Sequence, residues 1–362
     1  MNYHFRGEET IESPALVYYR DIIEENTAKA IAMAGGAERL WTHIKTHKTA
    51  ALVRMQMNRG ITRFKCATLM EAETCAREEA PHVLLAYPLI GPAINRFVRL
   101  RERYRSTLFW AIGDNLGQLE LLGKALAKSQ TPVNLLADIN AGMDRTGVPL
   151  ENLEDFCLAA AKITGLIFKG FHCYDGHLGI KDLAERKAAA GSIAKRLFAV
   201  KVSLEKKGIE IPVIVLGGSP TFPCHIDMPE VYLSPGTVFV YDNGYQTKFP
   251  DLDFVPGAAV MSRVISHPAA GLFTLDTGYK AIASDQTDRG IIHGLPQAKP
   301  VAQSEEHWVW RIEDREPPPI GAVLYIIPTH ICPTSALYPG IYVVSGGELV
   351  NYWEVSARNR LP

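Results

Sequence analysis

The chain has 362 residues, of which 47% are hydrophobic and 21% are charged, and its formal net charge is -1. This composition is typical of a globular protein with a full core, and the even spread of Lys and Arg argues against a nucleic acid or an anionic membrane surface as a partner. No apolar run reaches the ~18 residues of a membrane span, the polar start lacks a signal-peptide core, and the six cysteines form no CxxC motif, so we expect a cytoplasmic protein without a disulfide framework.

The region from residue 13 to residue 241 alternates short β-type runs with helical segments. The β-type runs are residues 15–19, 40–44, 63–66, 83–87, 107–111, 133–139, 166–173, 213–216 and 238–241. The clearest helical segments are residues 21–33, 69–79, 114–128, 153–163 and 183–206, and residues 50–58 are also helix-like. Repeated units of one strand and one helix predict a parallel sheet. Roughly eight such units favour an α/β fold of the closed (β/α)8, TIM-barrel type over an open sheet.

The character of the chain changes after about residue 242. Long helical periods give way to apolar runs that are separated by proline and glycine, which is typical of strands. These runs are residues 260–267, 272–284, 306–312, 322–327 and 340–350. The sequence therefore predicts a barrel over residues 12–250 and an all-β domain over residues 251–362, with residues 1–11 as a candidate for a further strand of the second domain.

The most informative motif is Thr-His-Ile-Lys-Thr-His-Lys at residues 42–48, between a predicted strand and a helical segment. Barrel folds place their reactive groups at the carboxyl ends of the strands. If the motif is a strand, His43, Lys45 and His47 share one face, and a lysine among such neighbours can lose its proton and attack a carbonyl carbon. Lys45 is therefore a candidate for a lysine that forms a Schiff base, and the alternative is a solvated basic turn.

Later strand ends carry groups that could bind an anion. Residues 138–148 end a strand at a glycine-containing turn and present Arg145, which could hold an anionic oxygen of a cofactor or lie on the surface at the start of a helix. The loops at residues 217–219 (Gly-Gly-Ser) and 234–237 (Ser-Pro-Gly-Thr) could cradle a phosphate with their backbone N–H groups, although glycine turns are common. Two such loops on late strands fit the position at which barrels bind phosphate.

Two further segments carry side chains suited to catalysis or metal binding. Residues 170–177 contain Tyr174, which could lie against a flat cofactor ring, and His177, which could act as a base; otherwise the segment is a polar loop. His330 and Cys332 would share one face of a short extended segment, which gives two ligands for zinc or a similar ion. The alternative for this pair is a buried His and Cys beside two prolines.

Taken together, these motifs resemble the fold-type III pyridoxal-phosphate enzymes, and more narrowly the D-threonine aldolase and D-serine dehydratase family. Eight short motifs, spread over nearly the whole chain, carry the resemblance. They are residues 13–16 (Ser-Pro-Ala-Leu), 43–48, 142–147, 217–219, 235–237, 276–280, 304–307 and 330–332. The resemblance implies an alanine racemase-like barrel, a C-terminal β domain and a homodimer with active sites near its interface.

The resemblance also implies a role for each candidate residue. Lys45 would carry pyridoxal phosphate, Arg145 would approach the phenolic oxygen of its ring, and Tyr174 would contact the ring. Four residues of the two glycine loops would bind the phosphate: Gly218, Ser219, Gly236 and Thr237. His330 and Cys332 would hold a divalent metal (Zn, Mn, Mg or Co) near the β-hydroxyl of the substrate.

The implied activity is a metal-assisted lyase that acts on D-3-hydroxy amino acids. An aldolase would release glycine and an aldehyde, with His177 as the base, whereas a dehydratase would release a 2-oxo acid and ammonia. Cys332 favours dehydration of D-serine or D-threo-3-hydroxyaspartate, since His-x-Asp is typical of the aldolases, but residues 170–176 look more like the aldolases. We expect the aldolase, keep the dehydratase as the alternative, and consider a racemase or a non-catalytic cofactor carrier a poorer fit.

The chain departs from the family pattern at two places. Residues 41–43 are Trp-Thr-His where the family often has Arg-Pro-His, and Ser234 stands where alanine racemases have an arginine that faces the pyridine nitrogen. A serine cannot deliver a positive charge, so the partner of that nitrogen is left open by the sequence.

Overall fold

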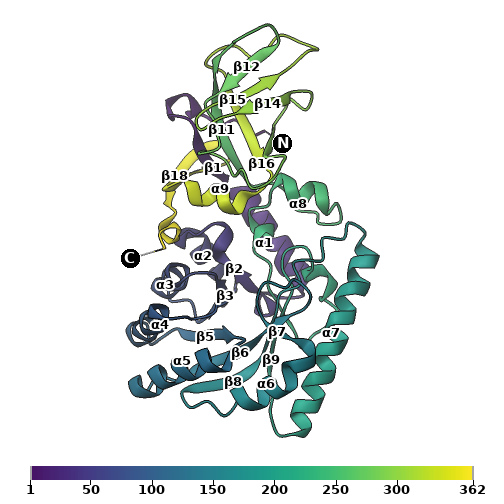
Figure 1. The fold of residues 1–362 in the computed structure, drawn as a ribbon. Helices are drawn as coiled ribbons and strands as arrows, with labels where there is room; N and C mark the ends of the chain where they lie inside the picture. The colour runs from purple at the N-terminus through teal and green to yellow at the C-terminus, as the bar shows by residue number, and fades with distance from the viewer. Residues whose placement is uncertain (1, 361–362) are drawn as a thin grey trace. The chain divides into compact units, whose positions relative to one another are not determined.

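The computed structural model describes residues 2–360, which divide into two units (Figure 1). The barrel unit consists mainly of Ala30–Lys45 and Ala50–Gly236, and the β unit consists of residues 2–29, Thr46–Thr49 and Thr237–Arg358. The chain therefore passes from one unit to the other several times. The domain boundary predicted at residue 250 stays a prediction.

The barrel unit is built on eight parallel strands that follow one another around a nearly closed sheet. They are β2 (Trp41–His43), β3 (Arg63–Cys66), β4 (His82–Leu85), β5 (Leu108–Gly113), β6 (Val133–Asn140), β8 (Leu166–Cys173), β9 (Val213–Leu216) and β10 (Tyr232–Leu233). The short β7 (Val148–Pro149) pairs with the end of β6. A single bridge between Leu40 and Leu233 brings the first and last strands together. The predicted (β/α)8 fold class is confirmed.

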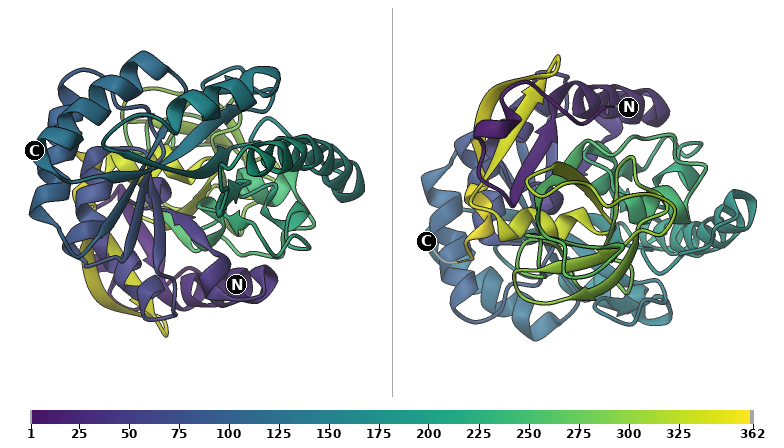
Figure 2. Two further views of the ribbon diagram at one scale, coloured as in Figure 1. Left: turned by 90° about the horizontal axis from the view of Figure 1, so that it is seen from below. Right: turned by 90° about the horizontal axis from the view of Figure 1, so that it is seen from above.

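Helices connect these strands and lie outside them, as the left view of Figure 2 shows. They are α2 (Ala50–Met57), α3 (Leu69–Arg77), α4 (Pro92–Arg103), α5 (Leu116–Ser129), α6 (Leu153–Ala160) and α7 (Leu183–Lys206), and α1 (Arg20–Ala34) precedes the first barrel strand. Side-chain caps fix three of the helix starts, because Thr68, Asn115 and Asp182 each accept a hydrogen bond from the backbone N–H three residues later.

Helix α4 was missed by the sequence analysis, which predicted no helix between the β-type runs at residues 83–87 and 107–111. Pro92 is in fact the first residue of the helix, where its missing N–H costs nothing. The buried residues Ile94, Phe97 and Val98 follow at helical spacing. The local sequence alone does not distinguish a proline that begins a helix from a proline that interrupts a strand.

The β unit contains a nine-stranded sheet of mixed direction. Its strands are β1 (Ala15–Tyr19), β11 (Ala258–Ser266), β12 (Leu272–Leu275), β13 (Gly290–Ile292), β14 (Lys299–Gln303), β15 (Trp308–Arg311), β16 (Val323–Pro328), β17 (Gly340–Ser345) and β18 (Glu348–Glu354). Two short helices, α8 (Asn243–Lys248) and α9 (Ile331–Leu337), belong to the same unit. The mostly β character expected of the C-terminal part is therefore confirmed.

Two predicted β-type runs are corrected by the structure. Residues 15–19, which the sequence analysis counted with the barrel region, form β1 of the other sheet, antiparallel to β11 and parallel to β17. Residues 237–239 form a 3-10 turn, so the run at residues 238–241 is not a strand, and β10 closes the barrel instead. Near the N-terminus, Arg6 makes one isolated bridge with Glu348 of β18.

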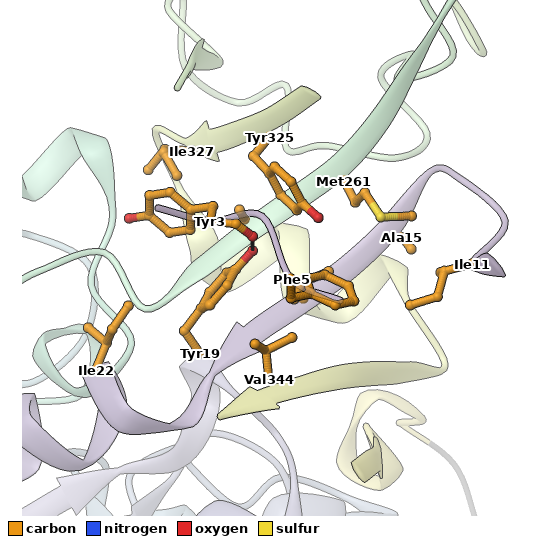
Figure 3. Packing of buried hydrophobic residues seen from close by; sticks show 12 residues of the cluster. Tyr3, Phe5, Ile11, Ala15, Tyr19, Ile22, Met261, Tyr325, Ile327 and Val344 are labelled. Atoms are coloured by element: carbon orange, nitrogen blue, oxygen red, sulfur yellow. Dashed lines mark hydrogen bonds between the residues drawn. The ribbon is translucent and has the colours of Figure 1, made fainter. Parts of the chain in front are cut away.

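An aromatic cluster explains why β1 joins the β unit (Figure 3). Tyr19 at the end of β1 donates a hydrogen bond of 2.5 Å to the carbonyl oxygen of Tyr3, and its ring meets that of Tyr3 edge to face. The rings of Tyr3 and Tyr325 stack with their centres 6.4 Å apart. Twelve buried aromatic and aliphatic residues from the N-terminal segment, from the start of α1 and from strands of the β unit stabilise the pairing.

Among residues 2–360, no helix combines the length and the apolar character that crossing a membrane requires.

Candidate active site

The barrel interior is apolar in its lower layers and polar at the carboxyl ends of the strands. Trp41 and Leu136 belong to the buried apolar interior. Because strand side chains alternate, the residues two positions later, His43 and Asp138, continue the same inward face. Strand register then places Lys65 beside His43 and His172 beside Asp138. These four polar residues are all buried, and they form the upper layer of the interior.

Lys45 follows this layer but does not lie on a strand. Strand β2 ends at His43, and Ile44–Thr46 form a 3-10 turn, so the prediction that His43, Lys45 and His47 share one strand face is wrong. Lys45 is half-buried, and its backbone N–H donates to the Nδ1 atom of His43 at 3.3 Å. His47 is fully buried in the β unit, where burial lowers its pKa to about 3 and keeps it neutral.

Three cationic side chains surround the ring of Tyr174. The Nζ atoms of Lys45 and Lys65 each lie 5.8 Å from the ring centre, and the Cζ atom of Arg145 lies 5.1 Å from it. These distances are typical of cation–π contacts. The structure therefore brings together three residues that the sequence analysis selected or implied, Lys45, Arg145 and Tyr174, and adds Lys65, which the sequence analysis missed.

Two glycines make room for this ring. A Cβ atom at Gly218 would lie 2.6 Å from the Tyr174 ring, and one at Gly176 would lie 2.1 Å from it. Both distances are shorter than any contact that a real side chain tolerates, so a larger residue at either position would displace the ring.

Two buried carboxylates lie near the cations, and each already has hydrogen-bond partners. Asp138 accepts hydrogen bonds from Nδ1 of His172 at 2.7 Å and from Oγ1 of Thr146 at 2.8 Å. Burial raises the pKa of Asp138, but these two hydrogen bonds and the charge of Arg145 outweigh it, so the carboxyl pKa is lowered. Asp138 therefore stays ionised at neutral pH.

The second carboxylate, that of Asp175, is held in a similar way. It lies 2.8 Å from Nε2 of His225 and accepts a hydrogen bond from the hydroxyl of Thr221. That hydroxyl also accepts the backbone N–H of Gly218 at 3.0 Å. Through the hydroxyl of Thr221, Asp175 therefore helps to fix the backbone of the predicted phosphate loop at residues 217–219.

The two glycine loops are joined to each other. Oγ of Ser219 accepts the backbone N–H of Gly236 at 3.1 Å, and a Cβ atom at Gly236 would lie 2.9 Å from the carbonyl oxygen of His43. Close approach of the loop to β2 therefore requires glycine at this position. The N–H groups of Gly218 and Gly236 both have partners within the protein, so a bound phosphate would have to compete for them. The phosphate-binding roles of these residues stay predictions.

The two remaining predicted residues of the barrel site, His177 and Thr237, have different surroundings. His177 is exposed, and its imidazole lies against Gly142, because a Cβ atom there would be 3.2 Å from Nε2. It thus lies beside the loop that carries Arg145. Thr237 belongs to the β unit, where its hydroxyl oxygen is 3.5 Å from the Sγ atom of Cys332.

The predicted metal pair lies at the start of α9 in the β unit. His330 is the extended residue before the helix, and Cys332 lies in its first turn, so the expectation of one extended segment is wrong. The carboxylate of Asp285 lies 2.6 Å from Nδ1 of His330, and the hydroxyl of Thr46 lies 3.1 Å from Sγ of Cys332. Burial lowers the pKa of His330, but its hydrogen bonds with Cys332 and Asp285 raise it to about 9.

This pair remains a half-site in the part of the chain that the structure describes. Within residues 2–360 there is no group of three or more His, Cys, Asp or Glu side chains arranged to hold a metal ion. Because Asp285 binds Nδ1 of His330, Nε2 is the ring nitrogen left to bind a metal, which is the usual arrangement for carboxylate-supported histidine ligands. A metal bound here would have two protein ligands and would complete its coordination with water or substrate.

Comparison with known proteins supports the resemblance drawn from the motifs. The family model "Alanine racemase, N-terminal domain" matches residues 19–243, and the model "Putative serine dehydratase domain" matches residues 257–344. A D-threonine aldolase from Arthrobacter sp is 28% identical over 361 residues, which cover 96% of this chain and 93% of the relative.

Solved structures agree in fold. The crystal structure of D-threonine aldolase from Filomicrobium marinum superposes with a TM-score of 0.91 and 25% identity, covering 99% of this chain and 98% of that one. D-threo-3-hydroxyaspartate dehydratase from Delftia sp. HT23 superposes with a TM-score of 0.82 and 21% identity, covering 96% and 98% of the two chains. The expected resemblance to fold-type III pyridoxal-phosphate enzymes is confirmed.

Proposed function

Since this chain belongs to the alanine racemase N-terminal domain family, we propose that it is a pyridoxal-phosphate-dependent lyase that acts on D-amino acids with a 3-hydroxyl group. The observation that carries the proposal is the arrangement of Lys45, Arg145 and Tyr174, with a lysine amine and a guanidinium over one aromatic ring. An aromatic platform ringed by cations suits a flat, anionic, aldehyde-bearing cofactor better than a neutral metabolite.

The predicted cofactor-binding residues fit pyridoxal phosphate in charge and in shape. Lys45 would hold the cofactor covalently, Arg145 would neutralise its phenolic oxygen, and Tyr174 would pack against its ring. Gly218, Ser219, Gly236 and Thr237 would bind the phosphate, with the loop amides exchanging their internal partners for phosphate oxygens. When bound, the cofactor supplies an electron sink for negative charge that develops at the α-carbon of an amino acid.

The remaining roles fall to side chains of this chain. The ionised Asp138 fixes the imidazole of His172 and the hydroxyl of Thr146, which keeps the floor of the site rigid and polar. His177, exposed beside the Arg145 loop, would accept the proton of the substrate's 3-hydroxyl group in an aldol cleavage. In a dehydration, the amine of Lys45 would instead remove the α-proton.

The His330–Cys332 pair would hold a divalent metal of the zinc type. An imidazole and a thiolate form a borderline-soft ligand set, and the carboxylate of Asp285 would fix the orientation of the ring. The hydroxyl of Thr46 lies where it can donate to the cysteine sulfur and so reduce the charge on that ligand. When bound, the metal supplies Lewis acidity toward a substrate hydroxyl group.

Between the two lyase reactions, retro-aldol cleavage to glycine and an aldehyde is the first proposal. The 28% identity with a D-threonine aldolase over 96% of the chain supports it, compared with 22% for D-threo-3-hydroxyaspartate dehydratase over 95%. Dehydration is the second candidate, because Cys332 provides a thiolate ligand where the aldolases typically have a carboxylate. We also propose a homodimer, which sedimentation equilibrium would test.

One experiment separates these outcomes. The purified protein is incubated with D-threonine, and acetaldehyde, glycine, 2-oxobutanoate and ammonia are measured together. Acetaldehyde with glycine supports the aldolase, whereas 2-oxobutanoate with ammonia and no aldehyde rejects it in favour of the dehydratase. Borohydride reduction followed by peptide mapping then identifies the lysine that carries the cofactor, with Lys45→Arg as the test variant and Lys162→Arg, an exposed lysine, as the matched control.

A further inference from the structure

Lys65 is the charged residue at the candidate site to which neither the motifs nor the comparisons assign a role. It lies on β3 in register with His43, and only 3% of its surface is exposed. Its neighbours confirm that it points inward: Phe64 and Cys66 face the other side of the strand, and Cys66 lies against Cys75 of α3. Its amine is as close to the Tyr174 ring as the amine of Lys45 is, at 5.8 Å.

The ammonium group of Lys65 has no anionic partner of its own. Within the described residues 2–360, no carboxylate lies at ion-pair distance from it and no hydrogen bond engages it. The two nearby carboxylates are occupied, Asp138 by His172 and Thr146, and Asp175 by His225 and Thr221. A buried ammonium without a partner is costly, so such groups are normally paired or lose their proton.

The surrounding charges explain how the protein tolerates this lysine. Burial lowers the pKa of Lys65 to about 7, and the positive charges of Lys45 and Arg145 act in the same direction. Asp138 and Asp175 oppose the shift. The buried imidazole of His172 also faces Lys65, and the charge of the lysine helps to lower the pKa of that ring. The amine is therefore neutral in a large fraction of molecules at neutral pH.

An anion placed among these cations would reverse the balance. A negative charge within a few ångströms favours the charged form of an amine. A ligand that binds the protonated amine more tightly than the neutral amine therefore raises the fraction of amine that is protonated. We propose that Lys65 is a second cofactor-binding lysine, whose amine takes up one proton from solvent and pairs with the anionic oxygens of pyridoxal phosphate when the cofactor binds. This inference rests on the proposed function, since it takes the cofactor to be a vitamin B6 phosphate.

Lys65 adds a positive charge to a site in which the loop at residues 234–237 (Ser-Pro-Gly-Thr) supplies none. Ser234 cannot deliver the positive charge that alanine racemases place near the pyridine ring, and its hydroxyl is already used, donating to the carbonyl oxygen of Trp41 at 2.9 Å. Lys65 provides a positive charge from a different strand. The Lys65 amine becomes fully protonated only when the ligand binds, so the protein without ligand does not hold a permanently charged lysine in its interior.

Calorimetry on the full-length chain, freed of cofactor, tests this inference. Pyridoxine 5′-phosphate serves as the probe because it carries an alcohol in place of the aldehyde and therefore cannot react with Lys45. Titrations at pH 8 in two buffers with different ionisation enthalpies give the number of protons taken up on binding. A group with a pKa of about 7 is roughly nine-tenths neutral at pH 8, so the wild-type chain should take up close to one proton per probe bound.

Three variants identify the group that takes up the proton. Lys65→Arg keeps a permanent charge, so it should bind the probe with similar affinity but without proton uptake. Lys65→Met, with a side chain of similar length, should lose both the uptake and roughly tenfold or more of the affinity. Lys162→Met, at an exposed position, should behave as wild type. Circular dichroism confirms that each variant is folded.

The outcomes separate this inference from the proposed function. If wild type binds no probe, the proposed function itself fails. If wild type binds the probe without proton uptake, or if both Lys65 variants show the wild-type uptake, Lys65 is not the group and this inference is overturned while the cofactor assignment stands. Uptake that is lost in both Lys65 variants, with affinity retained only in Lys65→Arg, supports it.

Discussion

Replacing Asp138 by alanine tests the buried network at the upper layer of the barrel interior. The carboxylate is 4% exposed and accepts hydrogen bonds from His172 at 2.7 Å and from Thr146 at 2.8 Å. Alanine would leave the imidazole of His172 without a partner on either nitrogen, since its Nε2 atom already has none among the described residues. Because the pKa of the buried His172 ring is lowered, the ring is neutral at pH 7, and leaving such a buried polar group without a partner costs about 1–3 kcal/mol. We expect the free energy of unfolding to fall by that amount.

Urea unfolding at pH 7, followed by tryptophan fluorescence, measures this loss. Thr146→Ala removes only one of the two hydrogen bonds and should cost about 1 kcal/mol. Asp155→Ala, an acidic residue on the surface of α6, is the matched control and should change stability by no more than about 0.5 kcal/mol. A loss below about 1 kcal/mol for Asp138→Ala would show that the network adds little and would refute the reasoning.

The pH dependence of the same variant has a definite sign. The folded-state pKa of Asp138 is lowered, so the carboxylate stabilises the protein above its unfolded pKa of about 3.9 and loses that effect as the pH falls through the lower folded value. The stabilisation that the ionised Asp138 supplies should therefore be lost below about pH 4, so the difference in stability between wild type and Asp138→Ala should shrink there.

The remaining predictions concern the ring platform and the metal pair. Gly218→Ala would place a Cβ atom 2.6 Å from the Tyr174 ring and should weaken pyridoxal phosphate binding, measured by absorbance titration. Gly191→Ala in α7 is the matched control, because a Cβ atom there meets open space, and it should leave binding unchanged. The same control should raise the free energy of unfolding by about 0.5–1 kcal/mol, since alanine is the better helix former. Asp285→Ala should weaken zinc binding by roughly 10-fold or more in equilibrium dialysis, because the imidazole of His330 loses the carboxylate that orients it; unchanged affinity would contradict that role. A chelator should abolish turnover of D-threonine while the cofactor absorbance remains, and activity that survives full metal removal would reject a metal-dependent mechanism.

Local patterns predicted much of the barrel because short β-type runs alternate with helical segments along this part of the chain. The ranges 63–66, 166–173 and 213–216 coincide with β3, β8 and β9, and 183–206 coincides with α7. The same patterns cannot tell which sheet a strand joins. Residues 15–19 are aliphatic and aromatic, like those of a barrel strand, but their partners, β11 and β17, lie far away in the sequence.

The candidate site was predictable only where a motif is local. Lys45, Arg145 and Tyr174 each stand at a strand end in a distinctive sequence, and the structure brings them together. Lys65 was missed because a single lysine within a four-residue strand is usually an exposed residue at the sheet edge. Only the register with β2, which the sequence does not contain, shows that it points into the barrel.

The pairing of β1 has a consequence for how the protein is made. The hydroxyl of Tyr3 reaches the carbonyl oxygen of Pro256, which lies 253 residues away along the chain. On the ribosome, β1 is therefore synthesised long before β11 and β17, and its apolar side chains remain without their partner strands until those strands have been made. Contacts of such long sequence separation slow folding, so we expect the barrel to be native-like first and the N-terminal segment to be the part that chaperones protect during synthesis.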